Sequence, residues 1–247
     1  MERLVSRVTR GRTPEDKLAR LPLNHYQYPV GSIREVERLG LKLTLDLSDL
    51  LDWAIFFGLV DSGLERLYGH TQPSDVVIDV GANNGMVSMR LAQQVGVGGR
   101  VLSFEPHPEN FRRLEHNLSL NDLPHVSAFP VGLGEAPGQT SMLSVDKFNL
   151  GMHRIVPDRS GGAQPADTIE LTTLDSVREK HLFDRVDWVK LDVEGYEFKV
   201  LRGGRLMLEE LRPRLFVKVD DAHLRNQGDS AEALLGELAR LGADLLE

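Results

Sequence analysis

Short apolar runs alternate with amphipathic stretches along the middle of the chain. The apolar run at residues 76–80 leads through a short turn to residues 86–95, where apolar side chains recur at helical spacing. A second apolar run, residues 100–104, precedes another amphipathic stretch that starts after two prolines. This order of strand, helix, strand and helix predicts an α/β fold with a mostly parallel sheet.

The turn between the first strand and the first helix contains two glycines. Its sequence from residue 81 to residue 85 is Gly-Ala-Asn-Asn-Gly, and glycine lets the backbone approach a ligand where a β-carbon would block it. Asn83 and Met86 stand where a dinucleotide fingerprint requires glycines. Asp79 precedes the turn, and its charge would repel a diphosphate but suit a cationic or zwitterionic ligand. The turn therefore favours S-adenosylmethionine, which carries no phosphate.

Further charged residues stand at the ends of the later strands. Glu105 follows the second strand, where a carboxylate can accept both ribose hydroxyls of a bound adenosine. The strand at residues 187–191 is followed by Asp192 and Glu194, and ligands bind at the carboxyl ends of strands in open α/β sheets. We expect these groups to share one site, with Lys190 either belonging to it or simply ion-paired.

Four segments of the chain match, in order, those of a known family. They are Ile-Asp-Val-Gly-Ala-Asn-Asn-Gly, Phe-Glu-Pro-His-Pro-Glu-Asn, Asn-Leu-Ser-Leu-Asn, and Val-Lys-Leu-Asp-Val-Glu-Gly-Tyr-Glu with the following Val-Leu-Arg-Gly-Gly. On these residues the chain resembles the FkbM-type methyltransferases, over residues 39–220. The resemblance implies a class I methyltransferase fold, which is a Rossmann-like three-layer sandwich. It also implies O-methylation of a hydroxyl on a sugar, glycolipid or polyketide.

The resemblance assigns roles to individual residues. Asp192 matches the acidic position beside the transferred methyl group, and Asp61 stands where many members carry a glutamate. The positions that match cofactor-binding residues of the family are Asp79, Gly81, Ala82, Asn83, Gly85, Glu105, Pro106, Asn149 and Asp192.

The expected chemistry needs a group that removes a proton from the acceptor. The sulfonium of S-adenosylmethionine already activates the methyl group, so the enzyme has to position the acceptor oxygen and deprotonate it. The candidates for the general base are Asp192, Glu194, His153 and His223. Asp192 ranks first on motif position, and His223 ranks second because an imidazole takes up a proton near neutral pH.

A divalent metal is a further expectation to test. Asp192, Glu194, Asp220 and Asp221 could converge as oxygen ligands at the edge of the sheet. Carboxylates at strand ends are also found solvated or bound to helix N-termini, so the sequence leaves both arrangements open.

The chain before the first parallel strand forms a segment of its own. Residues 41–47 alternate between apolar and polar, which predicts a half-buried strand, and Ser48 can cap the helix that follows. In the class that the resemblance implies, N-terminal helices close over the cofactor and shape the acceptor pocket. We therefore expect residues 1–70 to form an extension and cap, and residues 71–247 to form the catalytic domain.

An aromatic stretch in this extension is a candidate for substrate binding. His25, Tyr26 and Tyr28 lie close together, and aromatic rings of this kind can stack on a sugar. The same residues can equally serve as anchors at the protein surface.

The C-terminal part predicts a shortened sheet. Residues 215–219 indicate a fifth strand, and a helix that starts at Asp229 or Ser230 ends near Gly242, only five residues before the end of the sequence. Class I methyltransferases normally finish with an antiparallel pair of strands. Either the sheet lacks its last strand, or the N-terminal strand or a second copy in a homo-oligomer covers that edge.

Composition and net charge limit the kinds of molecule that the protein is expected to bind. The net charge of −8 and the pI near 5.5 give no attraction toward a polyanion, which argues against nucleic acid and for a small-molecule or glycan acceptor. The absence of cysteine excludes disulfides and thiol-based metal sites. Without a membrane-length apolar run or an apolar signal core, we expect a cytoplasmic protein with no membrane span.

Two other functions are open on the same pattern. A nicotinamide-dependent sugar oxidoreductase or epimerase would need a better glycine fingerprint and a Tyr-X-X-X-Lys pair, and no such pair occurs in the sequence. A noncatalytic cofactor-binding scaffold would keep the fold but lose the acids at the strand ends, which this chain retains.

Overall fold

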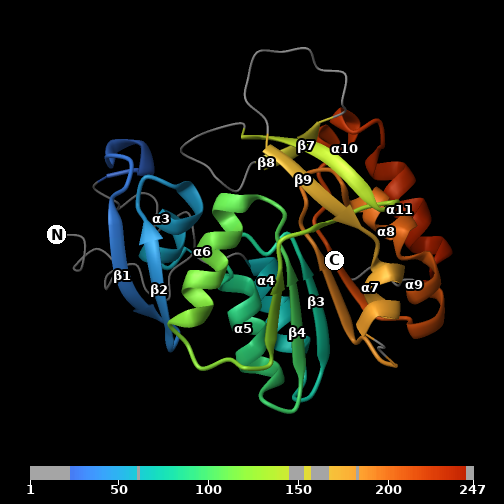
Figure 1. The fold of residues 1–247 in the computed structure, drawn as a ribbon, viewed down its shortest axis with the longest axis horizontal. Coiled ribbons are helices and arrows are strands. Elements are labelled where there is room, and N and C mark those ends of the chain that lie inside the picture. Colours follow the sequence, from blue (N-terminus) through green and yellow to red (C-terminus); the bar gives the residue numbers. More distant parts are fainter. Residues whose placement is uncertain (1–22, 60–61, 145–152, 157–166, 182–183, 243–247) are drawn as a thin grey trace.

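A five-stranded parallel sheet forms the centre of the molecule (Figure 1). The computed structural model describes residues 23–59, 62–144, 153–156, 167–181 and 184–242. The strand order across the sheet is β11 (Arg214–Val217), β10 (Trp188–Leu191), β3 (Val76–Val80), β4 (Arg100–Phe104) and β5 (Val126–Phe129). Each neighbouring pair is parallel, which confirms the predicted α/β class.

Helices cover both faces of this sheet and complete the three-layer sandwich. Val77 and Val101 pack on one face against α4 (Ser62–His70) and α5 (Met86–Val95). Ile78 and Leu102 point to the other face. The helices there are α7 (Leu174–His181), α8 (Glu197–Gly203), α9 (Arg205–Leu211) and α11 (Ala231–Arg240). Because both faces are buried, the strands are mainly apolar, and the sequence pattern predicted four of these five; β5 was not predicted.

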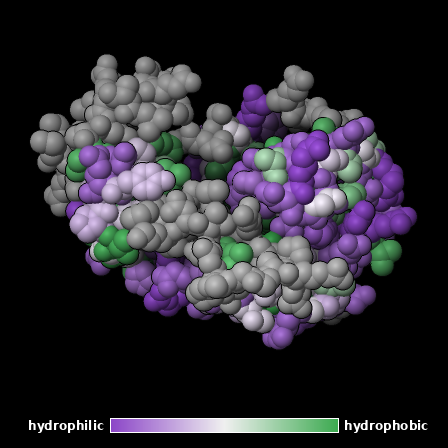
Figure 2. All heavy atoms as spheres, turned by 90° about the horizontal axis from the view of Figure 1, so that it is seen from above, coloured by the Kyte–Doolittle hydropathy of each residue, from purple (hydrophilic) through white to green (hydrophobic). Residues whose placement is uncertain are grey.

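A second, smaller sheet is inserted between β5 and α7. Its strand order is β6 (Gly132–Leu133), β9 (Asp167–Thr172), β7 (Gly138–Ser144) and β8 (His153–Val156). Figure 1 shows it above the central sheet, beside α10 (Asp221–Asn226), and Gln227 donates a hydrogen bond to the carbonyl of Ile155 at 2.6 Å. Seen from above, hydrophilic residues predominate on the half of the molecule that carries α10 and α11 (Figure 2).

The N-terminal module, residues 23–59, packs separately from the central sheet. It consists of η1 (His25–Gln27), the antiparallel pair β1 (Ile33–Arg38) and β2 (Leu41–Asp46), and α3 (Leu50–Phe57). Leu41, Leu43 and Leu45 alternate into a core with Trp53 and Phe57 of α3, so the predicted half-buried strand is confirmed. The cap of α3 is Asp49, whose side chain accepts the N–H of Asp52, and the prediction of Ser48 as the cap was wrong.

Side chains of α6 (Pro108–Ser119) and the residues after it close the free edge of β2. Asn117 accepts a hydrogen bond from the N–H of Thr44 at 2.9 Å. Asn121 accepts from the N–H of Lys42 at 2.9 Å and donates to its carbonyl at 2.8 Å. The module is thereby bound to the helix that follows β4.

Strand β11 forms the outer edge of the central sheet within the described residues. The two N-terminal strands pair with each other at the opposite side of the molecule (Figure 1), so the idea that they cover this edge was wrong. Coverage by a second copy stays a prediction. Among the helices that the structure describes, none combines the length and the apolar character needed to cross a bilayer.

Candidate active site

The loop between β3 and α5, residues 81–85, packs tightly against its neighbours. Gly81 has a φ of 82°, and a β-carbon there would lie 2.0 Å from the carbonyl oxygen of Asp192. Gly85 has a φ of 88°, and a β-carbon there would lie 2.5 Å from the side chain of Leu114. Only glycine fits such positions without strain. The sequence argument assigned the close approach at Gly81 to a ligand, but the structure places backbone of the same protein there.

A buried ion pair lies beneath this loop. Asp79 is fully buried, and its Oδ1 lies 2.9 Å from Nζ of Lys190 on the adjacent strand. Lys190 Nζ also donates to the carbonyl of Gly81 at 2.9 Å, while Asp79 Oδ2 accepts from Ser88 at 2.6 Å. Burial lowers the pKa of Lys190, but Asp79 and the other nearby carboxylates outweigh it and leave that pKa raised.

This pairing changes the role expected for Asp79. Its charge is compensated within the protein, so the inference that the charge is free to select a cationic ligand was wrong. Of the two alternatives for Lys190, the structure shows the ion-paired one. The pair instead supports the loop 81–85 from below, through the bond from Lys190 to Gly81.

Glu105 lies at the end of β4, next to the same loop. One carboxylate oxygen accepts the N–H of Asn83 at 2.9 Å, and the other accepts the N–H of His107 at 3.0 Å. Its exposed fraction is 5%. Burial raises the pKa of Glu105 to about 7, although both hydrogen bonds act in the opposite direction. Pro106 follows and packs near Gly132 of β6.

A cluster of charged residues gathers at the ends of β10 and β11. Lys218 Nζ lies 3.0 Å from Asp192 and 3.0 Å from Glu194. The second oxygen of Glu194 lies 2.6 Å from Nδ1 of His223, at the start of α10. Burial lowers the pKa of Lys218, but the two carboxylates outweigh it and raise that pKa. Three of the four predicted base candidates therefore meet, joined by a lysine that was not predicted.

A buried carboxylate that the sequence analysis did not single out shapes the turn after β10. Glu197 begins α8, and its Oε1 accepts the N–H groups of Val193 and Gly195 at 3.0 and 3.4 Å. Glu194 in this turn has a φ of 51°, which is unusual for a residue with a β-carbon. Burial raises the pKa of Glu197. The position of Glu197 in the Glu-Gly-Tyr-Glu segment could have identified it from the sequence.

The four carboxylates considered for a metal do not converge. Asp220 caps α10 by accepting the N–H groups of Ala222 and His223. Asp221 accepts the N–H of Ala231 at 2.9 Å and pairs with Arg225. No group of three or more metal-ligating side chains occurs in the described part of the chain. The expectation of a metal site formed by Asp192, Glu194, Asp220 and Asp221 was therefore wrong.

The predicted aromatic stretch is largely buried. Tyr28 has an exposed fraction of 5% and packs in the core of the N-terminal module, so its prediction as a sugar-stacking residue was wrong. His25 is also buried, with its ring centroid 6.1 Å from that of Trp53. Only Tyr26, with an exposed fraction of 56%, is open to solvent.

The structure does not place the side chains of three residues that the sequence singled out. Asn149 and Asp61 lie outside the described residues. The backbone of His153 begins β8, but its side chain is outside what the structure describes.

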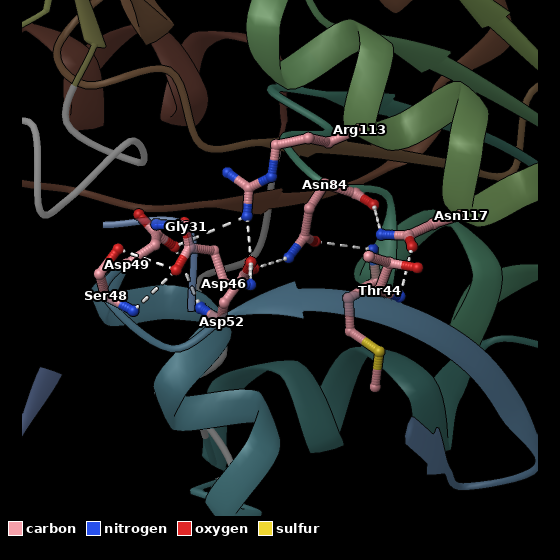
Figure 3. A network of polar contacts seen from close by, with 10 residues as sticks. Gly31, Thr44, Asp46, Ser48, Asp49, Asp52, Asn84, Arg113 and Asn117 are labelled. Atoms are coloured by element: carbon pink, nitrogen blue, oxygen red, sulfur yellow. Dashed lines mark hydrogen bonds and ion pairs between the residues drawn. The ribbon is translucent and has the colours of Figure 1, made fainter. Parts of the chain in front are cut away.

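A polar network between the N-terminal module and the loop 81–85 was missed by the sequence analysis (Figure 3). Asp52 of α3 accepts a hydrogen bond from Asn84 of the loop at 2.6 Å and pairs with Arg113 of α6. The sequence feature that could have revealed this network is Asp52 itself, an aspartate on the buried face of an otherwise apolar helix. The identity of its partners depended on how α3 and α6 pack together.

Comparison with known proteins identifies a family that the chain matches. A family model described as "Methyltransferase FkbM domain" matches residues 79–245. Methyltransferase sdnD of Sordaria araneosa is 30% identical over 155 residues, which are 51% of this chain and 59% of that protein. The hexuronic acid methyltransferase AglP of Haloferax volcanii is 29% identical over 142 residues, 57% of this chain and 54% of that protein.

One solved structure is similar to the chain at low identity. The crystal structure of Methyltransferase FkbM from Methylobacillus flagellatus KT has a TM-score of 0.45 and 21% identity, covering 68% of this chain and 36% of that one. The chain spans somewhat more than half the length of the two curated relatives named above. Because the family model covers well over half of the sequence, the chain belongs to the FkbM methyltransferase family.

Proposed function

We propose that this methyltransferase uses S-adenosylmethionine to methylate a hydroxyl on a sugar, glycolipid or polyketide-type natural product. The observation that carries the proposal is the position of Glu105, a buried carboxylate at the end of β4 that is bound to the loop 81–85. Ligands of open α/β sheets bind at this edge. A relative that bears the name hexuronic acid methyltransferase supports a sugar-type acceptor.

The residues present fit the adenosine end of this cofactor. Each oxygen of Glu105 accepts one backbone N–H, and an ionised carboxylate offers about four lone-pair sites in total. Glu105 can therefore accept the two ribose hydroxyls while it keeps both backbone contacts. In this proposal the backbone of residues 81–85 lies against the cofactor, with Gly81, Ala82, Asn83 and Gly85 forming the contact surface.

The cluster at the ends of β10 and β11 serves the acceptor in this proposal. S-adenosylmethionine supplies a methyl group on a sulfonium, so the chain's own residues orient the hydroxyl and take its proton. We place the general base at His223, because Glu194 fixes its ring through Nδ1 and leaves Nε2 to take up the proton. Asp192, which shares Lys218 with Glu194, would orient the acceptor.

Three further statements about partners belong to the proposal. The acidic chain is expected to act on a small molecule or glycan rather than on nucleic acid, and to work in the cytoplasm. Strand β11, at the edge of the described sheet, is the place where a second copy could pair.

Calorimetric titration with S-adenosylhomocysteine and with NAD tests the cofactor. We expect the first to bind and the second not to bind. Glu105→Ala removes hydrogen bonds to a charged group worth about 1.5–3 kcal/mol, so affinity should fall roughly ten- to a hundred-fold. Wild-type affinity in a folded Glu105→Ala variant would reject the assignment of this residue.

Incubation with methyl-labelled cofactor and a panel of hydroxylated acceptors tests the reaction, with mass spectrometry of the products. His223→Asn should lower kcat about a hundred-fold or more, because a general base contributes roughly 10²–10⁴-fold, while cofactor affinity stays near wild type. Asp192→Asn, measured beside it, should raise KM more than it lowers kcat. The reverse pattern would transfer the role of base to Asp192.

A further inference from the structure

Asp52 is a carboxylate buried in a mainly apolar helix. Its side chain has no exposed surface, whereas its buried neighbours on α3 are Trp53, Phe56 and Phe57. Burial raises the pKa of Asp52 to about 6, although Arg113 acts in the opposite direction. A buried carboxylate is tolerated only where polar partners surround it, so the partners of Asp52 indicate what it does.

Three separate parts of the chain meet at Asp52 (Figure 3). One oxygen accepts the N–H of Asp46, at the end of β2, at 2.7 Å and pairs with Arg113 of α6. The other oxygen accepts a hydrogen bond from the side-chain amide of Asn84 at 2.6 Å. The carboxylate thus joins the N-terminal module to the loop 81–85.

Asn84 is fully engaged on the other side of this contact. Its exposed fraction is 1%, and its side-chain oxygen accepts the N–H of Met86, the first residue of α5, at 3.1 Å. Its backbone carbonyl accepts from Asn117 at 2.9 Å. Asn83 and Gly85 on either side both have positive φ, and a turn with such a backbone keeps one shape only where its surroundings fix it.

The position of Asn84 governs a group that faces the cofactor site. Asn83 is the residue directly before Asn84 in the loop, and its N–H is the one that Glu105 accepts at 2.9 Å. Movement of Asn84 away from Asp52 would therefore shift the N–H that orients the proposed ribose-binding carboxylate. Asp52 itself lies outside residues 79–245, which the family model matches, so family membership assigns it no role.

We propose that Asp52 is a positioning residue of the cofactor site, which acts through Asn84 to hold the loop 81–85 in its binding shape. The identity of the ligand rests on the proposed function, whereas the contact between the two side chains does not. The N-terminal module then contributes to cofactor affinity, in addition to any part it takes in the acceptor pocket.

A reciprocal exchange of the two side chains tests the contact itself. Asp52→Asn places an amide NH₂ where an acceptor is needed, and Asn84→Asp sets two carboxylates against each other. Each single variant should bind S-adenosylhomocysteine about tenfold more weakly or worse. The double variant restores one donor and one acceptor in reversed order, so it should regain most of the lost affinity.

Ser48→Ala is the matched control. Ser48 is buried in the same module and donates to Asp46 at 2.8 Å, but within the described residues it makes no hydrogen bond to the loop 81–85. This variant should lower the unfolding temperature and leave the dissociation constant of S-adenosylhomocysteine unchanged at temperatures where the protein is folded. A purely structural role of Asp52 would give the same pattern for Asp52→Asn.

Hydrogen exchange of the ligand-free protein gives a readout that does not depend on the cofactor. The amides of residues 83–86 should exchange at least about tenfold faster in Asp52→Asn than in wild type or Ser48→Ala. If Asp52→Asn does not fold, Asn84→Ala breaks the same contact from the loop side. If wild type does not bind S-adenosylhomocysteine, the proposed cofactor is wrong and the exchange rates still decide the inference. Wild-type exchange in the loop of both folded variants would overturn it.

Discussion

The raised pKa of Glu105 makes cofactor affinity depend on pH in a predictable direction. The carboxylate is buried at the end of β4, and burial brings its pKa to about 7 in the ligand-free protein. Ribose hydroxyls donate hydrogen bonds, so they are bound by the ionised form and not by the protonated one. Lowering the pH from 8 to 6 should therefore weaken the binding of S-adenosylhomocysteine.

The magnitude follows from the fraction of ionised carboxylate. With a pKa near 7, about nine-tenths of Glu105 is ionised at pH 8 and about one-tenth at pH 6. The dissociation constant should therefore increase roughly tenfold across this interval. Binding at pH 7 should also release about half a proton, because the ligand selects the ionised form.

Calorimetric titration across pH 6 to 8, in buffers with different ionisation enthalpies, measures both quantities. Glu105→Gln is the matched control, because it keeps the size of the side chain but cannot titrate. Its affinity should be lower than that of wild type and nearly independent of pH. A wild-type affinity that does not change between pH 6 and pH 8, or a variant that keeps the same pH dependence, would refute the assignment of Glu105 as the ribose-binding group.

Stability measurements test the supports of the loop. Gly81→Ala should lower the unfolding temperature more than Gly85→Ala. The new β-carbon at residue 81 meets the backbone carbonyl of Asp192 at 2.0 Å, whereas the one at residue 85 meets only a side chain. Equal losses of unfolding temperature in the two variants would contradict this. Lys190→Met should destabilise the protein by about 3–5 kcal/mol, because it leaves Asp79 buried without its ionic partner. The double variant Asp79→Asn, Lys190→Met should recover much of that loss in denaturant unfolding, and a single variant as stable as wild type would refute the role of the pair. Between pH 4.5 and pH 7 the free energy of unfolding should fall as Glu105 ionises, since its pKa is raised on folding, and Glu105→Gln should remove that part of the slope.

The elements around the loop 81–85 were predictable because local pattern determines them. Strands β3 and β4 and helix α5 have the predicted bounds, since mainly apolar runs and a strong helical stripe end at glycine or shortly before proline. Strand β9 also alternates, with Ile169 buried between exposed residues, but the sequence analysis made no prediction there. The second sheet was therefore missed although part of its signal was present.

The partners of the charged residues could not be derived from the sequence. Lys190 lies opposite Asp79 because β10 pairs with β3 in one particular register, and these residues are 111 positions apart. Ser48 and Asp49 are both good capping residues, and only the backbone geometry decides that Asp49 meets the free N–H. Tyr28 is aromatic and follows a polar stretch, yet the packing of α3 on β2 buries it. Each of these outcomes depends on tertiary contacts.

Most carboxylates around the site are paired with a cation of the protein, and this identifies Glu105 as the carboxylate available to a ligand. Asp79 is paired with Lys190, Asp52 with Arg113, and both Asp192 and Glu194 with Lys218. Within the described residues, only two of the buried carboxylates named above, Glu105 and Glu197, have no cation within ion-pair distance.

These two carboxylates differ in where they lie and in which backbone N–H groups they bind. Glu197 accepts both N–H groups of its own turn with one oxygen, and its other oxygen is buried without a hydrogen-bond partner. Glu105 accepts one N–H group with each oxygen, so both oxygens keep an open lone pair, and it lies at the end of β4 beside the loop 81–85. Unused acceptor capacity on a buried carboxylate is unfavourable unless donors arrive with a ligand. Of the two, Glu105 is the one that directly follows a strand of the central sheet, where open α/β sheets bind their ligands. Two vicinal ribose hydroxyls supply those donors without adding charge, which is the physical reason to place the adenosine of the cofactor at Glu105.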